Sequence, residues 1–541
     1  MQVKNTTIQN RSKHARLESE HRIPTQTVER STVADFLYRL LDLNVSKESV
    51  IYSVGSHLVR GNNNPHLLKF LSEYDYPTVT IPDIPEDEFD LLGSIYQFLN
   101  SKKENLERGS FYTGGIIASD FVSDLVFDSN QLILDPACGS GSFLFRSNAP
   151  SSSIFGVDND PIAIMIAKFN YFIKFPNADA PHLYCADFLK WAIQNQTLTF
   201  EYIIGNPPYG ANMDLRNVFS YYVFSGESFS YFIEFAFRLL STNGIFRFLL
   251  PESLLNVKRH SDIRQFILEQ TDLKRIKRFT SKFSGVMSDV FLLEIGHGQT
   301  PNYFFEDKKI EIIPKRIVKQ FNHSVFVYLT QKDIAILNKV NSLKSETLAK
   351  STFGLGVVTG DNRTKLFDHE IMNSEAILTG KEIQKYHCER PVNYIVFDRS
   401  NLQQVAPDYI YRAPEKLIYK TISKYLKVAL DTNATLSTNS ANIIIPKMET
   451  HDIYSVLGFL NSDLYSYLHL KLFGGVNKIA KENLMALPFP KLSSEQLTSI
   501  SQLVRETLTV GDDLKLQEFV HKDIFNLTDE EIFYLRKSIE N

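Results

Sequence analysis

Short apolar segments alternate with longer apolar or amphipathic segments in the central part of the chain. The short segments predict five strands, LILD, SIFGVD, HLYCAD, FEYIIG and GIFRFLL, between residues 132 and 250. AIMIAKFNYFIKF and SYFIEFAFRLL, which lie between them, predict helices. Almost continuously apolar strands that alternate with helices are typical of a parallel sheet covered by helices on both faces. The fold class is therefore predicted to be α/β, with a mostly parallel, Rossmann-like sheet.

The regions on either side show different patterns. Residues 33–105 predict helices, and the last of these, DEFDLLGSIYQFLNSKKENLE, is amphipathic. Beyond about residue 340, short strands such as ANIIIP alternate with irregular segments, and helices return at IYSVLGFLNSDLYSYLHLKL and at the end of the chain. We expect a helical N-terminal segment (1–104), an α/β domain (105–335) and a mixed α+β domain with C-terminal helices (336–541).

Composition and charge indicate an ordinary globular protein. The chain is 43% hydrophobic and 22% charged, and its net charge of -4 gives no global argument for nucleic-acid binding. A binding face would have to be local. The stretch from Lys258 to Lys282 is rich in lysine and arginine, and it predicts either phosphate contacts or a solvated helix face.

The cysteines and the apolar runs bear on the compartment. Cys138, Cys185 and Cys388 are far apart, form no CxxC pair and are odd in number, which argues against a zinc site and against a disulfide framework. The first residues are polar, with no signal-peptide core, and no run of about 18 apolar residues exists. We expect a cytoplasmic protein with no membrane span and no metal.

The segment DPACGSGSF, from Asp135 to Phe143, follows the first predicted strand. Gly139 and Gly141 would let the backbone pass close to a ligand at the carboxyl edge of the sheet. The spacing satisfies neither the dinucleotide fingerprint nor the phosphate loop. An ordinary tight turn between strand and helix is the alternative.

Acidic residues end the next two strands. Asp158 could accept hydrogen bonds from both hydroxyls of a ribose, or could cap the following helix. Asp160, directly before Pro161, is the better cap candidate and leaves Asp158 for a ligand. Asp187 could accept from an exocyclic amino group, with Phe188 against a purine face; the alternative is a surface acid and a core phenylalanine.

The fourth strand ends in Asn206-Pro207-Pro208-Tyr209. The Asn206 side-chain oxygen and the Pro207 carbonyl are two acceptors side by side, which suits an NH₂ group with two protons to donate. Tyr209 could stack on the ring that carries this group, while the prolines make the geometry rigid. A proline-rich turn with a core tyrosine is the alternative.

DPACGSGSF, GVDNDP, CADFL and NPPYG, in this order, resemble the amino-methylating S-adenosylmethionine-dependent DNA methyltransferases, and in particular their gamma class, the TaqI-like N6-adenine enzymes. The resemblance implies that S-adenosyl-L-methionine is the cofactor. It assigns cofactor binding to Asp135, Ala137, Gly139, Gly141, Asp158, Asp187 and Phe188. It assigns catalysis to Asn206, Pro207 and Tyr209.

The resemblance extends to both sides of these motifs. ERGSFYTGGIIASDFV is similar to the family's motif that closes over the methionine end of the cofactor, which adds Tyr112 and Thr113, although Gly114 stands where proline is usual. KFSGVMSDVFLLEI is similar to the motif whose phenylalanine packs on the target base, which implies base binding by Phe283, together with Pro208. Phrases such as FGLGVVTGDNRTKLF and GFLNSDLYSYL resemble the TaqI-like specificity domain.

The implied activity is methyl transfer to N6 of an adenine flipped out of double-stranded DNA. The implied setting is a type II restriction-modification system, with a cognate restriction endonuclease on a separate chain. Three alternatives stay open. They are an N4-cytosine DNA methyltransferase, a fused restriction endonuclease, for which residues 1–105 lack a convincing nuclease motif, and a non-catalytic DNA-binding subunit. Ribosomal RNA and protein glutamine are further substrates served by NPPY cores, and the long C-terminal domain argues against glutamine.

Overall fold

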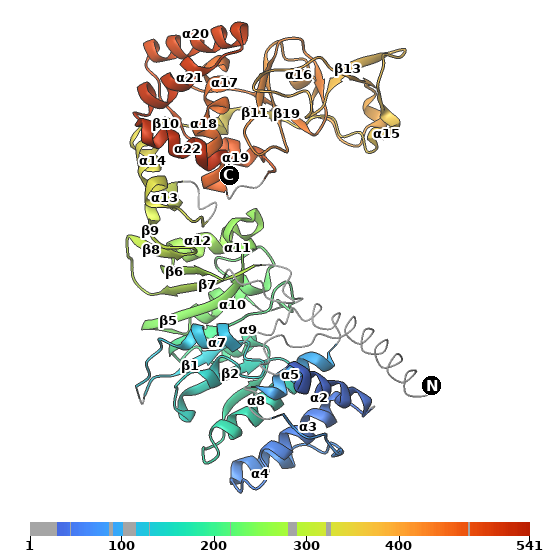
Figure 1. Ribbon diagram of the computed structural model, residues 1–541, viewed down its shortest axis with the longest axis vertical. Coiled ribbons are helices and arrows are strands. Elements are labelled where there is room, and N and C mark those ends of the chain that lie inside the picture. The colour runs from blue at the N-terminus through green and yellow to red at the C-terminus, as the bar shows by residue number, and fades with distance from the viewer. Residues whose placement is uncertain are drawn as a thin grey trace. The chain divides into compact units, whose positions relative to one another are not determined.

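The computed structural model describes residues 30–43, 45–85, 90–100, 115–128, 130–211, 213–216, 218–279, 289–320, 326–473 and 477–540. The chain divides into two compact units, with the division between Ile312 and Ile313 (Figure 1). The boundary expected at residues 335/336 falls inside one helix of the second unit, α14 (Gln331–Ser342). No described helix has the length and apolar character needed to cross a membrane.

A nine-stranded sheet forms the centre of the first unit, in the order β3-β2-β1-β4-β5-β7-β6-β8-β9. The five strands from β3 to β5 are parallel, and β7 runs antiparallel to β5 and β6. The parallel sheet and its five strands confirm the pattern-based prediction. The bounds are β1 (Ile133–Asp135), β2 (Ile154–Asp158), β3 (His182–Cys185), β4 (Phe200–Gly205), β5 (Leu240–Pro251), β6 (Asp272–Arg278), β7 (Val290–Gly296), β8 (Asn302–Glu306) and β9 (Ile310–Pro314).

The strand order reverses beside β1, which lies between β2 and β4. In register, Ile133 pairs with Ile154 on one side and with Tyr202 on the other. The carboxyl ends of β1, β2 and β4 therefore meet at one edge of the sheet. Ligands of open α/β sheets bind in the crevice at such a switch point.

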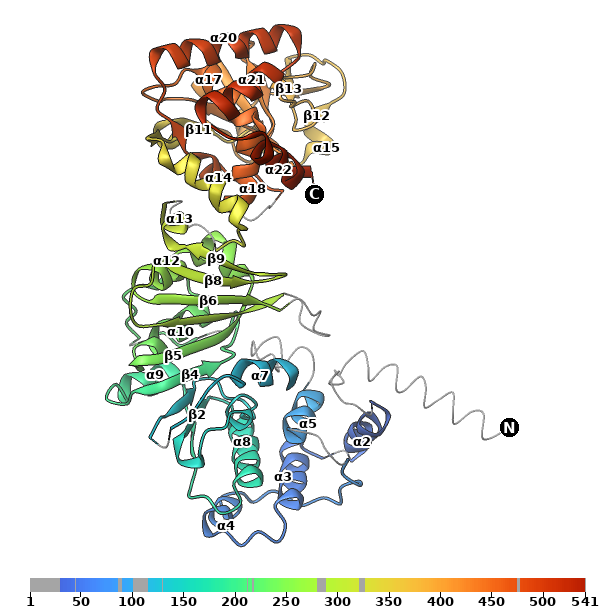
Figure 2. The same cartoon turned by 60° about the vertical axis from the view of Figure 1, so that its left-hand side comes forward.

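The N-terminal helices share their hydrophobic core with the sheet. Figure 2 shows α3 (Lys47–Leu58), α5 (Leu91–Leu99) and α8 (Pro161–Lys174) side by side, and the three helices contact one another. α3 and α8 approach so closely that a Cβ on Gly55 would lie 2.5 Å from the Phe169 ring. Buried residues of α2 (Arg30–Asp42), α4 (Pro65–Ser72) and α7 (Gly115–Val122) belong to the same core. The helical character predicted for this region is confirmed, and the helices pack into the sheet domain.

Two further helices pack on the central strands. α10 (Ser228–Phe237) contacts β5, and α12 (Ser261–Glu269) contacts β6. Every described side chain of α10 is buried, which matches its near-continuous apolar sequence SFSYFIEFAF. A connecting segment joins the turn at the end of β4 to α10.

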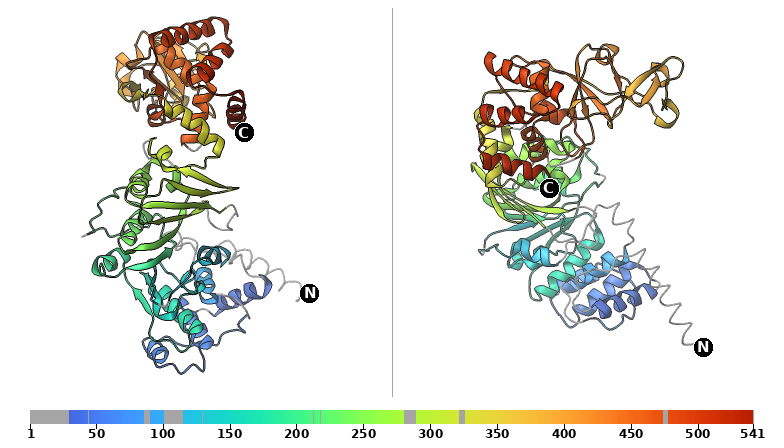
Figure 3. Two further views of the ribbon diagram at one scale, coloured as in Figure 1. Left: turned by 90° about the vertical axis from the view of Figure 1, so that its left-hand side faces the viewer. Right: turned by 45° about the horizontal axis from the view of Figure 1, so that its top comes forward.

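The second unit has a five-stranded sheet, β11-β19-β16-β17-β14, and a four-stranded sheet, β12-β15-β13-β18. Figure 3 shows the C-terminal helices of this unit, drawn red, gathered beside its strands, drawn orange. The predicted helix over IYSVLGFLNSDLYSYLHLKL is two helices that meet at Ser462. The strand bounds are β10 (Ser345–Glu346), β11 (Thr352–Gly354), β12 (Leu366–Phe367), β13 (Ser374–Leu378), β14 (Tyr386–His387), β15 (Asn393–Val396), β16 (Lys416–Lys420), β17 (Val428–Asp431), β18 (Leu436–Ser437), β19 (Ala441–Ile445) and β20 (Phe489–Pro490). The helix bounds, with α14 given above, are α13 (Lys315–Gln320), α15 (Asn362–Lys365), α16 (Asp408–Tyr411), α17 (Ile453–Asn461), α18 (Asp463–Phe473), α19 (Lys481–Ala486), α20 (Ser494–Val510), α21 (Leu514–Glu518) and α22 (Asp529–Glu540).

Candidate active site

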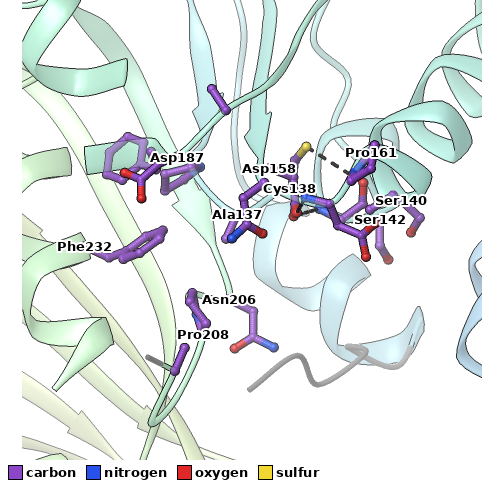
Figure 4. Close-up of a pocket in the computed structure, with 18 of the residues that line it drawn as sticks. Ala137, Cys138, Ser140, Ser142, Asp158, Pro161, Asp187, Asn206, Pro208 and Phe232 are labelled. Atoms are coloured by element: carbon purple, nitrogen blue, oxygen red, sulfur yellow. Dashed lines mark hydrogen bonds between the residues drawn. The ribbon is translucent and has the colours of Figure 1, made fainter. Parts of the chain in front are cut away.

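A cavity of about 580 Å³ lies at the carboxyl edge of the sheet, where β1, β2 and β4 end (Figure 4). Its volume is within the range of ordinary small-molecule sites. Ala137, Gly139, Asp158, Asp187, Phe188, Asn206 and Pro208 are among the lining residues. In Figure 4, Asn206 and Pro208 lie together below Phe232, across from Ala137 and Cys138. The fold thus brings together residues from four separate motifs of the sequence.

Gly139 and Gly141, in the turn after β1, are glycine for different structural reasons. Gly139 lines the cavity with φ +54, and a Cβ there would meet no atom of the described residues within 4 Å. Its N–H donates to Oδ2 of Asp158 at 2.9 Å. Gly141 has φ +84, and a Cβ there would lie 2.0 Å from the Phe145 ring. Gly139 therefore brings open backbone to the cavity, whereas Gly141 is required by packing and does not line it.

Asp135, at the end of β1, is completely buried behind the cavity lining. Its Oδ1 accepts a hydrogen bond from the Ala137 N–H at 3.0 Å, while Oδ2 has no hydrogen-bond partner. Burial, with a contribution from the nearby Asp158 charge, raises the pKa of the Asp135 carboxyl to about 8. A Cβ on Gly205 would lie 2.6 Å from Asp135 Oδ1, so glycine at the end of β4 makes room for this carboxyl.

Asp158 stands at the tip of β2 with both oxygens in backbone hydrogen bonds. Besides the Gly139 N–H, it accepts from the Asp160 N–H at 2.9 Å, through Oδ1. Asp160 is the N-cap of α8 and accepts from the Ile162 N–H, which confirms the capping prediction. The Tyr96 hydroxyl donates to the other oxygen of Asp160 at 2.5 Å. Asp160, and not Asp158, is therefore the N-cap of α8, and Asp158 lines the cavity.

Asp187 and Phe188 follow β3. Asp187 is the N-cap of α9 (Phe188–Gln194) and accepts from the Lys190 N–H at 3.1 Å, while its side chain also lines the cavity. Phe188 is 3% exposed, and its ring lies 5.1 Å from that of Phe232. Asp187 is thus a helix cap and Phe188 a buried phenylalanine, and both residues also line the cavity.

The Asn206-Pro207-Pro208-Tyr209 turn presents only part of itself to the cavity. Asn206 and Pro208 line it, whereas Pro207 is buried and neither Pro207 nor Tyr209 is among the lining residues. The Tyr209 hydroxyl has Asn206 Oδ1 at 2.5 Å and the Leu249 carbonyl at 3.0 Å as acceptors. Burial raises the pKa of Tyr209, so the hydroxyl remains a donor. The ring packs edge-on against Phe229.

Three of the predicted site residues, Tyr112, Thr113 and Phe283, lie outside the described residues. No group of three or more His, Cys, Asp or Glu side chains that could hold a metal ion occurs in the described part of the chain.

One wall of the cavity was not foreseen. Helix α5 contributes Gly93, Tyr96 and Gln97, and its C-cap Asn100 also lines the cavity. The N-cap of α5 is Asp90, which has the left-handed φ of +63. Asp90 accepts from the Gly93 N–H at 3.0 Å and from Asn170 Nδ2 at 2.8 Å, and it also accepts from the Ser140 hydroxyl. Asn170 donates in addition to the Ser140 carbonyl at 3.0 Å. An acid directly before the apolar run LLGSIYQFL is an N-cap signal that could have marked Asp90.

The basic stretch after α11 (Ser253–Asn256) does not form one open cationic face. On β6, Arg275 pairs with Glu294 at 2.8 Å, Lys277 with Asp120 at 2.5 Å and Arg278 with Glu252 at 2.9 Å. Arg264 is 1% exposed and donates to the carbonyls of Leu254 and Val257. Phosphate contacts and a solvated helix face were the two alternatives for this stretch. Arg275, Lys277 and Arg278 lie on a strand, not on a helix, and have acidic partners within the unit, while phosphate contacts stay a prediction. Lys258 and Arg259 are exposed.

Residues 87–347 match the family model described as N-6 DNA methylase, and residues 375–489 match the TaqI-like C-terminal specificity domain. The type II methyltransferase M.VspI of Vibrio sp. (strain 343) is 24% identical over 287 residues, which cover 50% of this chain and 70% of that enzyme. The type I restriction enzyme MjaVII methylase subunit of Methanocaldococcus jannaschii is 25% identical over 167 residues, 27% of this chain and 28% of that subunit. This chain therefore spans less than a third of the archaeal subunit.

Among solved structures, the type IIL restriction-modification enzyme MmeI, determined in complex with DNA, has the same fold. The TM-score is 0.52 at 14% identity, over 95% of this chain and 90% of that one. The N-6 DNA methylase match contains all nine strands of this sheet and the motifs from DPACGSGSF to NPPYG. The chain belongs to the N-6 DNA methylase family of restriction-modification DNA methyltransferases and carries a TaqI-like specificity domain.

Proposed function

We propose that the protein transfers a methyl group from S-adenosylmethionine to N6 of an adenine flipped out of double-stranded DNA, at a specific site, as the modification enzyme of a restriction-modification system. The observation that carries the proposal is the position of Asn206. Its side-chain amide borders a cavity whose other walls come from the glycine turn, Asp158 and the β3–α9 junction. An amide acceptor thus lies beside a site with the chemistry of a nucleoside pocket.

The residues of the cavity fit the cofactor. Asp158 is a carboxylate that lines the cavity and suits ribose hydroxyls, Asp187 can accept from the adenine amino group, and Phe188 provides an apolar surface for a purine face. The open space in front of Gly139 lets a ligand approach the backbone. When bound, S-adenosylmethionine supplies a methyl group on a positively charged sulfur. Asp135, buried with one unpartnered oxygen, supports the turn from behind.

The target amine is a weak nucleophile because its lone pair is delocalised into the ring. Two acceptors, Asn206 Oδ1 and the Pro207 carbonyl, would hold both of its hydrogens and orient the nitrogen lone pair. This is catalysis by positioning and by preorganised dipoles. Pro208 and Phe283 are the proposed contacts of the extruded base. Tyr209 acts, in this proposal, through its bond to Asn206.

The same pair of acceptors suits the amino group of cytosine, so the product identifies the base. The protein is expressed in a host free of DNA methylation, and the extracted DNA is digested to nucleosides for mass spectrometry. Methylation-sensitive sequencing of the same DNA maps the site. N6-methyladenine at one sequence motif supports the proposal. N4-methylcytosine, or cofactor binding without any methylated base, contradicts it.

The second unit, which contains the TaqI-like match, is proposed to read the DNA sequence. A cognate restriction endonuclease on a separate chain completes the proposed system. Magnesium-dependent cleavage of DNA by the purified chain would contradict that division of labour. The control is the Asn206→Ala variant, which should produce no modified base under the same expression conditions.

A further inference from the structure

An exposed aromatic loop connects the NPPY turn to α10. Phe219, Tyr221 and Phe224 have exposed fractions of 78%, 74% and 75%. Three large aromatic side chains so exposed within six residues are unusual, because aromatic surface is normally buried or covers a binding site. Val223, in the same loop, is 1% exposed and attaches it to the protein core.

A buried acid holds the first half of the loop in place. Glu234 of α10 has no exposed surface, and its Oε1 accepts from the Tyr221 N–H at 3.0 Å. Its other oxygen accepts from the Ser220 hydroxyl, whose oxygen in turn accepts from the Val223 N–H at 2.8 Å. The loop therefore has a specified backbone conformation that directs its rings outward.

The second half of the loop is held by α12 and by the segment before it. Asp262 Oδ2 accepts from the N–H groups of Phe224, at 2.6 Å, and Ser225, at 2.8 Å. Arg259 donates from Nε to the Ser225 carbonyl at 3.1 Å. The guanidinium of Arg238 lies 5.1 Å from the centre of the Tyr221 ring. Cations thus accompany the aromatic rings, and exposed Lys258 adjoins Arg259 in the chain.

The end of the segment that carries the loop, at Glu227 and Ser228, returns to the NPPY turn. The Gly210 N–H donates to Glu227 Oε1 at 2.7 Å, and the Ser228 hydroxyl donates to the Pro208 carbonyl at 2.5 Å. Because Pro208 lines the cavity, the base of the loop stands at the cavity wall. When a nucleic acid inserts one base beside Asn206, the nucleotides on either side of that base would lie close to this loop.

We propose that the loop from residues 218 to 225 is a base-stacking surface for DNA, in which Phe219 and Phe224 contact nucleobases next to the extruded one. Aromatic rings interleaved with lysine and arginine are the chemistry that binds unstacked bases and phosphates. Removing one base from a duplex exposes the faces of its neighbours, and apolar wedges stabilise such disrupted steps. This inference rests on the proposed function, since it takes DNA to be the substrate.

The test compares the Phe219→Ala/Phe224→Ala double variant with the wild type. The duplex carries a site selected for binding to the protein from a pool of random sequences, with a fluorescein at one end for anisotropy. Loss of stacking at two bases should raise the Kd for this duplex by roughly 30-fold or more. Calorimetric titration with S-adenosylmethionine should give a Kd within about twofold of wild type, because the substituted rings are exposed and lie outside the cavity lining.

A second measurement locates the contact. 5-Iodouracil at thymine positions flanking the target base crosslinks to stacked aromatic side chains on irradiation, and mass spectrometry of the digested complex should identify Phe219 or Phe224. The Phe219→Trp/Phe224→Trp variant should retain wild-type binding. Phe533→Ala is the matched control, because Phe533 is 69% exposed on α22, outside the region that matches the specificity domain.

Anisotropy requires no methyl transfer, so the two proposals fail separately. An inactive wild type with loop-dependent DNA binding contradicts the proposed function alone. An active wild type whose double variant binds and methylates DNA equally well overturns the loop proposal. Unchanged DNA binding combined with loss of binding to a purified cognate endonuclease overturns it too, and assigns the loop to a protein partner.

Discussion

The hydroxyl of Tyr209 lies 2.5 Å from Oδ1 of Asn206, with the carbonyl of Leu249 on β5 as its second acceptor. The tyrosine of the NPPY turn therefore orients the amide through its hydroxyl, while its ring packs against Phe229.

Tyr209→Phe should lower the methyl-transfer rate by roughly 3- to 10-fold, because the loss of one orienting hydrogen bond costs about 1 kcal/mol. The Kd for S-adenosylmethionine should not change. Single-turnover kinetics and calorimetry give the two numbers. Tyr465→Phe is the matched control, because it removes a buried hydroxyl that donates to the Pro488 carbonyl in the second unit. A faster Tyr209→Phe enzyme would show that the tyrosine competes with the substrate.

Asn206→Ala should lose methyl transfer by a factor of about 100 to 1,000, the effect of removing one preorganised polar group from a reaction centre. Because only the amide group is lost, cofactor binding by the remaining walls should persist and be measurable by calorimetry. Asn206→Asp retains an acceptor oxygen and should be less impaired than the alanine variant. Methyl transfer at the wild-type rate by Asn206→Ala would falsify the assigned role.

Asp90→Ala should weaken cofactor binding although Asp90 is not among the cavity-lining residues. Its carboxylate joins α5 to Ser140 and Asn170, so its removal leaves buried donors unsatisfied, at about 1–3 kcal/mol. We expect a Kd for S-adenosylmethionine about tenfold higher, together with a lower melting temperature. Asp361→Ala, which removes an N-cap in the second unit, is the control for capping alone. An unchanged Kd in a destabilised Asp90 variant would restrict Asp90 to a structural role.

Asp135 should make stability depend on pH. Its pKa is raised from 3.8 to about 8, so the folded state binds a proton that the unfolded state has released between these values. The contribution of this proton to the free energy of unfolding is fully present below about pH 4 and is lost as the pH rises through about 8. The free energy of unfolding falls by at most ~1.4 kcal/mol per pH unit over this range. Urea unfolding of wild type and Asp135→Asn at several pH values measures it. The wild type should lose stability relative to the variant on going from pH 5 to pH 8, and parallel profiles would contradict the buried neutral carboxyl.

Much of the first unit followed from local pattern. The alternation of apolar strands and helices predicted the parallel sheet, and the motif order placed Asp158, Asp187 and Asn206 at strand ends that β-sheet geometry brings together. The position of Asp160 before Pro161 predicted that Asp160 caps α8, because capping depends on neighbours two and three residues away.

The extension of the sheet by β6 to β9 was less visible, because a basic strand such as DLKRIKR reads equally well as a charged helix face. The strand has a register shift between Leu273 and Arg275, and Leu273 and Ile276 are both buried. Arg275 pairs with Glu294 on β7, and Arg278 pairs with Glu252, which directly follows β5. Partners that lie far apart in the sequence leave no trace in a local pattern.

The sequence by itself determined the chemistry of the turns, that is, which residues stand at the ends of β1, β2, β3 and β4, because those positions depend on short-range periodicity and on proline and glycine geometry. Only the tertiary structure decided which of these residues line the cavity. It turned Tyr209 toward Asn206, placed Gly141 against Phe145 and closed one wall with α5 through Asp90. Those outcomes depend on close packing between segments far apart in the chain, which no local pattern encodes.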